Sequence, residues 1–487
     1  MVKRTSHSPP AGRARRRSTA RRLVGLAACV AALLAPRAAS AAALPPIRHV
    51  FVVVLENESA AETFGPAAPA PYLAKTMTAA GASVPRYHGT SHASLGNYIA
   101  MVSGQAANVL TQADCPIFAD FLPGTGVVGS GGQASGVGCV YPAGVPTVAT
   151  QLQEAGYTWR AYAQSMGSDP ARERGVCGHP AINAVDGTQA ATPADQFATR
   201  HVPFLYFHAV IDDPVLCDSH VVSLDPLASD LASLSRTPNY AFITPDLCDD
   251  GHDDPCADPA RPGGYAAINR FLGTWVPRIT SSPAFQRDGL LIVTFDESKA
   301  SDTAACCGQV PGPGSPLPGI TGPGGGITGA VLLSPFIAPG TVTQVPYNHF
   351  TMLRSVEDLF GLPHLGMAGV AAGRSFGDDV FTRPGGTASS CVARPLPKAV
   401  GGRLPAGAIM QGVRLMRAAG RAYVTLRAVH SARLLVRVRP TGGAVRTLVS
   451  RRIGACRSYR IALPRGHGTA TLTASVGSGA QITARRY

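Results

Sequence analysis

Short apolar runs alternate with segments of helical periodicity between residue 46 and about residue 381. The runs VFVVVL, YAFIT, LLIVTF and GAVLLS show no polar alternation, and stretches such as PYLAKTMTAAG, VATQLQEAGY and HFTMLRSVEDLFG have the spacing of helices. Strands that lack period-two polarity are buried on both faces, as in parallel sheets covered by helices. The pattern therefore predicts an α/β fold with a mostly parallel central sheet flanked by helices.

The pattern changes after the segment TRPGGTASSCVARPLPKAVGGRLPAG, which is rich in proline and glycine. The later segments RAYVTLRAV, ARLLVRVRP and TATLTASV alternate apolar and polar residues, as antiparallel strands with one buried face do. We therefore place a domain boundary near Ser390. It separates a large domain over residues 42–390 from a small antiparallel β domain over residues 391–487.

The first 41 residues predict an export signal. The basic segment KRTSHSPPAGRARRRSTARR precedes the apolar run LVGLAACVAALLA, and AASA supplies a cleavage pattern near Ala41. The apolar run is shorter than the roughly 20 residues that a membrane-spanning helix needs. We expect residues 1–41 to be a signal peptide and the mature chain to be secreted or extracytoplasmic. The pair Arg21-Arg22 leaves Sec and twin-arginine export both open.

Ten of the 11 cysteines lie beyond the leader. An even set of cysteines in an exported chain favours disulfide bonds over reactive thiols. Spacing alone leaves their connectivity open, and a pairing of Cys248 with Cys256 is one of the alternatives.

Charge is divided unevenly along the chain. Residues 1–41 hold nine basic residues and no acid, residues 391–487 hold eighteen and no acid, and the segment between them holds sixteen against all 29 acidic residues. An acidic body thus precedes a cationic C-terminal segment, which suits an anionic cell-wall or membrane surface. Tyr423, Tyr459 and Tyr487 are its only aromatic residues, which argues against stacking on nucleic acid bases.

Two of the predicted strands end in acidic residues. VFVVVL runs into Glu56 and Asn57, and LLIVTF runs into Asp296 and Glu297, just before a long loop rich in glycine and proline. In open α/β sheets ligands bind outside the carboxyl ends of strands, so both pairs are expected on one rim. Either pair alone would suit helix capping. Together their oxygen ligands predict a site for a divalent metal ion, of open identity and number.

Three further clusters carry residues that could do chemistry. The segment YHGTSHASLGNYIAMVSG crowds serines with imidazole and amide groups, which suits an activated nucleophile. Helix capping, taken alone, is the more common role of such residues, and composition leaves Ser91 and Ser94 both open. TPDLCDDGHDDPC packs acids around His252, either as a proton-transfer site or as a solvated loop. YNHFTMLRSVEDLFG places His349 before an amphipathic helix, where an anion could bind.

Taken in order, these motifs resemble those of the bacterial and fungal phosphoesterase family of acid phosphatases and phospholipases C, which is related to the alkaline phosphatase superfamily. The resemblance extends from about Val50 to Gly366. It rests on the segments VVVLENES, SHASLGNYIAMVSG, CDSHVVSLDPLASDLASLSRTPNYAFITPDLCDDGHD, LLIVTFDES and NHFTMLRSVEDLFGLPHLG. It implies an alkaline-phosphatase-like fold for residues 42–390 and leaves the C-terminal hundred residues outside.

The resemblance also implies roles for individual residues. The predicted metal ligands are Glu56, Asn57, Asp296 and Glu297; the predicted nucleophile is Ser94; Asn97, His252 and His349 are predicted to be catalytic; and His92 and Asp250 are predicted to bind substrate. Three positions depart from the motifs of the family: Ala93 and Gly96 stand where prolines are usual, and Asp249 stands where an asparagine is usual.

These assignments predict an exported, metal-dependent phosphatase that hydrolyses phosphate monoesters through a phosphoserine intermediate. His252 or His349 would protonate the leaving group. A phospholipase C or another phosphodiesterase is the alternative within the family. A surface-binding protein that works through its arginine-rich C-terminal domain is the alternative of another class.

Overall fold

The computed structural model describes the chain in ten segments. They are residues 44–124, 130–312, 314–370, 372–383, 403–404, 409–418, 421–428, 432–453, 458–476 and 479–487. The predicted signal peptide and the predicted boundary near Ser390 therefore lie outside the described residues. Within the described segments, no helix combines the length and the apolar character needed to cross a membrane.

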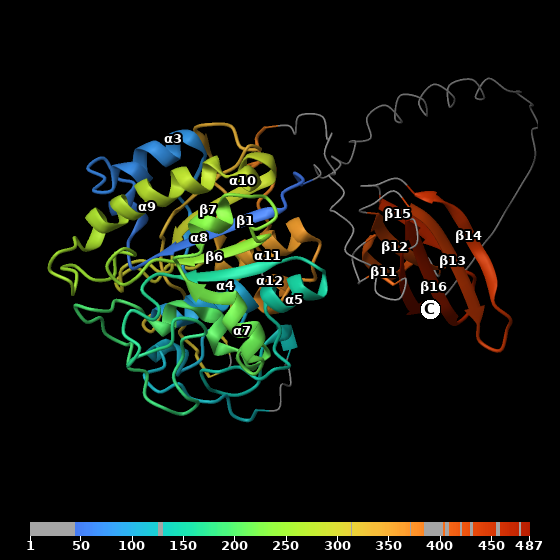
Figure 1. The fold of residues 1–487 in the computed structure, drawn as a ribbon, viewed down its shortest axis with the longest axis horizontal. Helices are drawn as coiled ribbons and strands as arrows, with labels where there is room; N and C mark the ends of the chain where they lie inside the picture. Colours follow the sequence, from blue (N-terminus) through green and yellow to red (C-terminus); the bar gives the residue numbers. More distant parts are fainter. Residues whose placement is uncertain are drawn as a thin grey trace, which may run out of the picture. The chain divides into compact units, whose positions relative to one another are not determined.

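An eight-stranded mixed sheet forms the centre of the large α/β body (Figure 1). Its strand order is β5 (Val221–Ser223), β4 (Trp159–Ala163), β6 (Tyr240–Thr244), β1 (His49–Leu55), β7 (Gly289–Phe295), β8 (Ala330–Leu333), β2 (Ala82–Val84) and β9 (Thr341–Val342). Strands β5, β4, β6, β1 and β7 are parallel to one another, whereas β8 is antiparallel to both β7 and β2. The predicted mostly parallel sheet is confirmed.

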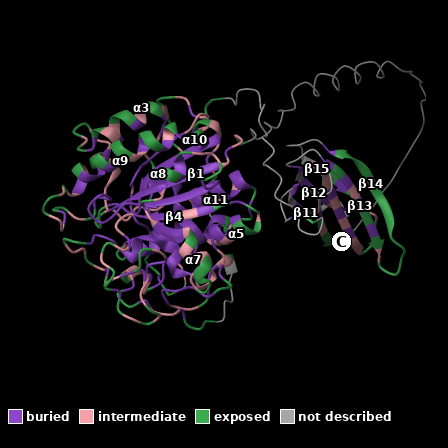
Figure 2. Cartoon of the chain, viewed as in Figure 1, coloured by how far each residue is buried: buried purple, intermediate pink, exposed green. Residues whose placement is uncertain are grey.

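Helices cover both faces of this sheet. Alternate residues of β1 enter two different cores: Val52 lies in the core that includes Leu95 and Met352, and Phe51 lies in the core that includes Ile268. Figure 2 shows the buried strands between helices whose outer faces are exposed. The helices are α2 (Ala60–Thr63), α3 (Thr78–Ala80), α4 (Ser94–Ser103), α5 (Val148–Glu154), α6 (His208–Ile211), α7 (Pro214–His220), α8 (Leu227–Leu231), α9 (Gly264–Ser281), α10 (Pro283–Asp288), α11 (His349–Phe360) and α12 (Gly366–Val370).

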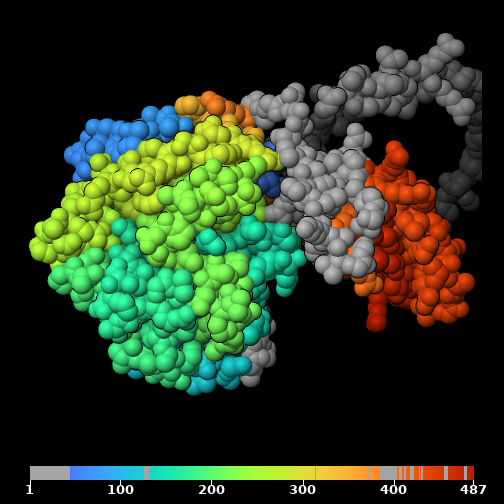
Figure 3. Space-filling model, in the orientation of Figure 1, coloured from blue at the N-terminus to red at the C-terminus, as the bar shows by residue number. Residues whose placement is uncertain are grey.

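Short helical segments and a small sheet complete the body. A π-helical segment, η1 (Tyr72–Met77), precedes α3, and 3-10 helices η2 (Thr111–Ala113), η3 (Ser130–Gly132), η4 (Thr199–His201) and η5 (Pro203–Tyr206) occupy the connections. Strands β3 (Tyr87–His88) and β10 (Tyr347–Asn348) pair in parallel outside the main sheet. In the space-filling view, α9 lies across the surface of the body (Figure 3).

The register of the central strands brings the predicted acidic residues together. Leu55 of β1 lies opposite Phe295 of β7, so that Glu56 and Asp296 are the next residues on neighbouring parallel strands. Strand β6, on the other side of β1, leads into the segment that carries Asp250. Three strands therefore deliver carboxylates to one rim of the sheet. The sequence predicted this for the pairs after β1 and β7, and Asp250 adds a third carboxylate.

The C-terminal strands form a β-sandwich. One sheet has the order β11 (Met410–Ala418), β12 (Arg421–Ala428), β15 (Ser458–Ala462), and the other has the order β14 (Arg446–Ile453), β13 (Ala432–Pro440), β16 (Gly468–Val476), β17 (Gly479–Arg486). All pairings are antiparallel, and residues of both sheets share one apolar core. The predicted antiparallel β structure of this segment is confirmed.

Disulfide bonds join eight of the cysteines that the structure describes. The pairs are Cys115–Cys139, Cys177–Cys217, Cys248–Cys256 and the sequence neighbours Cys306–Cys307. The prediction of disulfides is confirmed, including the pairing of Cys248 with Cys256. These bonds are consistent with an extracytoplasmic location.

Candidate active site

Glu56 lies at the centre of the candidate site. Its side chain is fully buried; Oε2 accepts a hydrogen bond from Ser94 Oγ at 2.8 Å and Oε1 accepts one from the Tyr98 hydroxyl at 2.6 Å. Burial, and then the neighbouring charges of Asp296 and Asp250, raise the pKa of Glu56 well above its usual range. Three carboxylates thus crowd into one buried space, which favours the presence of a cation.

A strained turn presents Ser94 to Glu56. Ser94 is the first residue of α4, and the preceding residue, Ala93, has φ +68° and ψ 132°. Residues with a side chain rarely adopt such angles, and holding one there costs about 1–3 kcal/mol. By contrast, the Ser91 hydroxyl donates to the carbonyl groups of His92 and Pro318, both at 2.9 Å. Ser94 is therefore the serine that faces the buried carboxylates.

The side-chain amide of Asn97 stabilises the turn before α4 through hydrogen bonds to its backbone. Its Oδ1 accepts hydrogen bonds from the backbone N–H groups of Thr90 at 2.8 Å and Ser91 at 2.9 Å. Its Nδ2 donates to the carbonyl groups of Ser91 at 3.0 Å and Ala93 at 3.3 Å. The oxygen and the nitrogen of the Asn97 amide thus both bind the backbone of this loop. These contacts suit a residue that positions Ser94.

The predicted metal ligands lie around Glu56 and Asp296. Asp296 Oδ1 accepts from the Asn57 backbone N–H at 3.1 Å, and the Asn57 side chain donates to Glu56 Oε2 at 3.4 Å. Asp296 Oδ2 is buried without a hydrogen-bond partner among the described residues. Burial raises the pKa of Asp296 to about 6. An unpartnered carboxylate oxygen beside a second carboxylate fits the donor set of a divalent cation.

Glu297 is held by His92 next to this group. His92 Nδ1 lies 2.8 Å from Glu297 Oε2, and His92 Nε2 lies 3.0 Å from the carbonyl oxygen of Asp302. Burial raises the pKa of Glu297 to about 8, although the hydrogen bond with His92 opposes the shift. The contacts to Asp302 and to Pro318 show that the long loop after β7 borders the site.

His201 is a site residue that sequence reasoning missed. Its Nδ1 lies 3.1 Å from Asp250 Oδ2, its Nε2 lies 3.4 Å from Glu56 Oε1, and its ring stacks on Tyr98 at a centroid distance of 5.1 Å. Ligand atoms of Glu56, His201 and Asp250 lie within 4.8 Å of one another, close enough to hold a metal ion. Burial, followed by the charges of Arg200 and His252, lowers the pKa of His201 well below its usual range.

Asp250 and His252 occupy different depths of the acidic loop. Asp250 is fully buried, and its Oδ1 accepts from the His252 backbone N–H at 2.8 Å. The His252 ring is partly exposed, with Nδ1 2.7 Å from Asp253 Oδ1 and Nε2 3.2 Å from the Arg200 guanidinium. Asp250 therefore belongs to the buried carboxylate group, while His252 stands at its edge.

The rest of the acidic loop is structural. Arg261 pairs with Asp246 at 2.8 Å and with Asp249 at 3.0 Å, and the disulfide between Cys248 and Cys256 closes the segment. These ion pairs compensate the charges of Asp246 and Asp249, so that both carboxylates can be buried in the folded loop.

His349 lies behind Asp296. Asn348 caps α11, and the His349 ring is fully buried, with Nε2 2.5 Å from the carbonyl oxygen of Asp296 and Nδ1 3.1 Å from the Tyr87 hydroxyl. Burial lowers the pKa of His349 to about 4. Both ring nitrogens have hydrogen-bond partners. The contact of His349 with the site is therefore the one with the backbone carbonyl group of Asp296.

Comparison with known proteins shows which proteins this chain is similar to. The model of the Phosphoesterase family matches residues 67–363. A "Phosphatidylinositol-3-phosphatase" of Mycobacterium tuberculosis is 27% identical over 329 residues, which cover 68% of this chain and 82% of that protein. A "Phosphate-repressible acid phosphatase" of Penicillium chrysogenum is 25% identical over 343 residues, which cover 68% of this chain and 65% of that protein.

A solved structure described as a protein in the alkaline phosphatase superfamily from Vibrio parahaemolyticus is also similar. Its TM-score is 0.39 at 10% identity, with 83% of this chain and 82% of that chain covered. The resemblance drawn from the sequence motifs is confirmed by the family match.

Proposed function

This chain belongs to the Phosphoesterase family and is a hydrolase of phosphoric esters, and on that premise we propose that it hydrolyses phosphate monoesters through a phosphoserine formed on Ser94. The observation that carries the proposal is the 2.8 Å hydrogen bond from Ser94 Oγ to the buried carboxylate of Glu56. A serine hydroxyl aligned with a buried base is the arrangement that nucleophilic catalysis needs.

The same group of residues fits a divalent metal ion. Glu56, Asn57 and Asp296, with Glu297 beside them, would hold the ion, and the buried Asp296 Oδ2 and His201 Nε2 are polar atoms without a hydrogen-bond partner among the described residues. Such an ion would lower the pKa of the serine hydroxyl and neutralise charge on the phosphoryl oxygens. The raised pKa values of Glu56 and Asp296 support this assignment, because both reflect buried carboxylates that need a compensating charge.

In the first step, Ser94 Oγ attacks phosphorus and its proton passes to Glu56 Oε2. The bond between phosphorus and the ester oxygen breaks, and His252, oriented by Asp253 at 2.7 Å, protonates the leaving oxygen. We assign this role to His252 rather than to His349, because the His252 ring is partly exposed at the edge of the buried carboxylates, whereas the His349 ring is fully buried. Arg200, 3.2 Å from His252, would bind phosphoryl oxygens.

In the second step, water attacks phosphorus of the phosphoserine and the bond to Ser94 Oγ breaks. Glu56 Oε2 returns its proton to Ser94 Oγ, and phosphate leaves. His252 accepts the proton of the water, as reversal of its first role requires. The enzyme then returns to its starting state.

Trapping of the phosphoenzyme tests the proposal. Ser94→Ala should abolish turnover of p-nitrophenyl phosphate and any acid-stable labelling with radioactive phosphate. Ser91→Ala is the matched control and should keep both, because its hydroxyl faces two backbone carbonyl groups. Labelling that survives in Ser94→Ala would refute the assignment of the nucleophile.

Monoester specificity is favoured over phosphodiester specificity by the relatives. The matched proteins from Mycobacterium tuberculosis and Penicillium chrysogenum carry the names of phosphatases. Turnover of p-nitrophenyl phosphate should therefore exceed release of phosphocholine from phosphatidylcholine. The reverse ranking would favour the phospholipase C alternative. We also propose that the protein is exported, which its disulfide bonds support.

A further inference from the structure

One sheet of the C-terminal sandwich has an outer face rich in arginine. In β13 the even-numbered residues from 434 to 438 lie in the sandwich core, whereas Arg433, Arg437 and Arg439 are exposed. Because side chains alternate along a strand, these three arginines lie on the same side of the sheet. That side is opposite the core that joins the two sheets.

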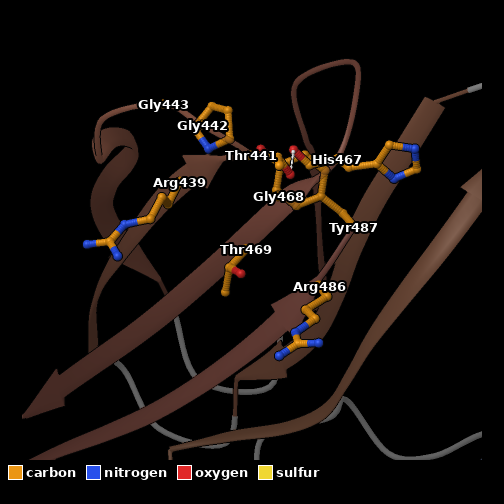
Figure 4. A pocket seen from close by; sticks show the side chains of 10 residues that line it. Arg439, Thr441, Gly442, Gly443, His467, Gly468, Thr469, Arg486 and Tyr487 are labelled. Carbon is orange, nitrogen blue, oxygen red and sulfur yellow. Dashed lines mark hydrogen bonds between the residues drawn. The ribbon is translucent and has the colours of Figure 1, made fainter.

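The strand register extends this row across the sheet. Arg439 lies opposite Thr469 of β16, and Thr469 lies opposite Arg486 of β17, as Figure 4 shows from close by. Arg433 lies opposite Arg452 of β14. The arginine face is therefore defined by the following residues: Arg433, Arg437, Arg439, Arg452 and Arg486, together with the hydroxyl-bearing Thr469, Thr471, Thr473 and Ser475 of β16.

The charge of the arginine face is not balanced by the C-terminal segment. Residues 391–487 contain no acidic side chain. Within the described part of the chain, the five guanidinium groups of this face make no ion pair. Arg433 and Arg452 even lie directly opposite each other, an arrangement of like charges that destabilises a sheet. An anion bound across these strands would relieve that repulsion.

The face leads into a hollow at one end of the sheet. This hollow has a volume of about 710 Å³. The side chains of Arg439, Thr469 and Arg486 line it together with the turn residues Thr441, Gly442, Gly443 and His467. Guanidinium groups bind phosphate oxygens in pairs through parallel N–H donors, and a threonine hydroxyl supplies one more donor between them.

We propose that the arginine face binds a linear polymer with repeating phosphate groups. Successive outward residues of a strand are about 7 Å apart and neighbouring strands about 5 Å apart, so the arginines offer a row of sites rather than a single one. A lipid surface suits the face less, because it carries no aromatic anchor. Nucleic acid suits it less, because Arg451 and Arg460 cover Tyr459 and Tyr423 and the side chain of Tyr487 is buried, so that no tyrosine of this segment is free to stack on bases.

Binding of long-chain inorganic polyphosphate to the full chain tests this proposal. The measurements use a Ser94→Ala background, so that the probe is not consumed, and follow the affinity at rising salt concentration. The variant R439Q/R486Q should bind about tenfold more weakly, and the slope of log affinity against log salt should fall by about two, one for each lost phosphate contact. Circular dichroism checks that the variant is folded.

The variant R236Q/R278Q is the matched control, because it removes two exposed arginines from the α/β body and changes the net charge equally. It should bind polyphosphate as the parent does. Equal losses in the two variants would show that net charge alone drives binding, and would overturn the proposal. Tighter binding to phosphatidylglycerol vesicles or to single-stranded DNA than to polyphosphate would overturn the assignment of the partner.

Discussion

The imidazole of His201 bridges Glu56 and Asp250, with Nε2 3.4 Å from Glu56 Oε1 and Nδ1 3.1 Å from Asp250 Oδ2. A histidine that gives one N–H to a carboxylate has its other nitrogen oriented as a potential metal ligand. The buried ring therefore links the carboxylate on β1 with the one in the acidic loop.

Replacement of His201 by Asn is predicted to weaken metal binding by about 10–100-fold, the usual effect of losing a ligand or an orienting partner. Metal content of the dialysed protein, and the metal concentration needed to restore activity, measure this effect. His208→Asn is the control, since His208 contacts Asp120 and Asp212 away from Glu56. An unchanged metal affinity in His201→Asn would place His201 outside the metal site.

Removal of the metal is predicted to make stability fall as the pH rises. Burial raises the pKa of Asp296 to about 6 and that of Glu297 to about 8 in the folded protein. A carboxyl group with a raised folded pKa stabilises the fold below its unfolded pKa, and this contribution is lost as pH rises through the folded pKa. The melting temperature of chelated protein should therefore decline between about pH 4 and pH 8.

Addition of a divalent cation should reverse most of that decline, because it stabilises the ionised carboxylates. Glu297→Gln removes a group whose pKa is raised to about 8 and should flatten the upper part of the profile. A melting temperature of the chelated protein that rises over the same range would contradict this account.

Substitution of Ala93 tests the strained turn before Ser94. Its φ of +68° is accessible to glycine without penalty and is worst for β-branched residues. Ala93→Gly is predicted to raise the free energy of unfolding by about 1 kcal/mol, and Ala93→Val to lower it by at least as much. Denaturant unfolding measures both. Equal stabilities of the two variants would show that the turn is not strained.

The site residues that follow strands β1 and β7 were predictable from the sequence, whereas His201 was not. Glu56 and Asp296 follow apolar runs that could only be buried parallel strands, so their position on one rim follows from the fold class. His201 lies in a 3-10 turn with no motif around it, and its packing on Tyr98 and its contact with Asp250 bring it to Glu56. Contacts of this kind depend on tertiary structure rather than on local pattern.

The direction of β8 shows a similar limit in the fold. Its apolar run predicted a strand, but the described residues of the connection from β7 form a long loop without a crossover helix, and β8 returns antiparallel to β7. A parallel return needs a connection that crosses back over the sheet, usually through a helix. The composition of the loop after Asp296 therefore indicated that β8 is antiparallel to β7, whereas the apolar run of β8 itself did not indicate its direction.

The disulfide between Cys248 and Cys256 is predicted to stabilise the acidic loop and, through it, the position of Asp250. These cysteines are 8 residues apart, and a cross-link of that length lowers the entropy of the unfolded chain by an amount worth about 2–3 kcal/mol. C248S/C256S should lose that much stability and most activity. C306S/C307S is the matched control, because neighbouring cysteines enclose no chain and their cross-link restricts the unfolded state little. Equal losses of unfolding free energy in the two double variants would show that loop closure is not the source of the stabilisation.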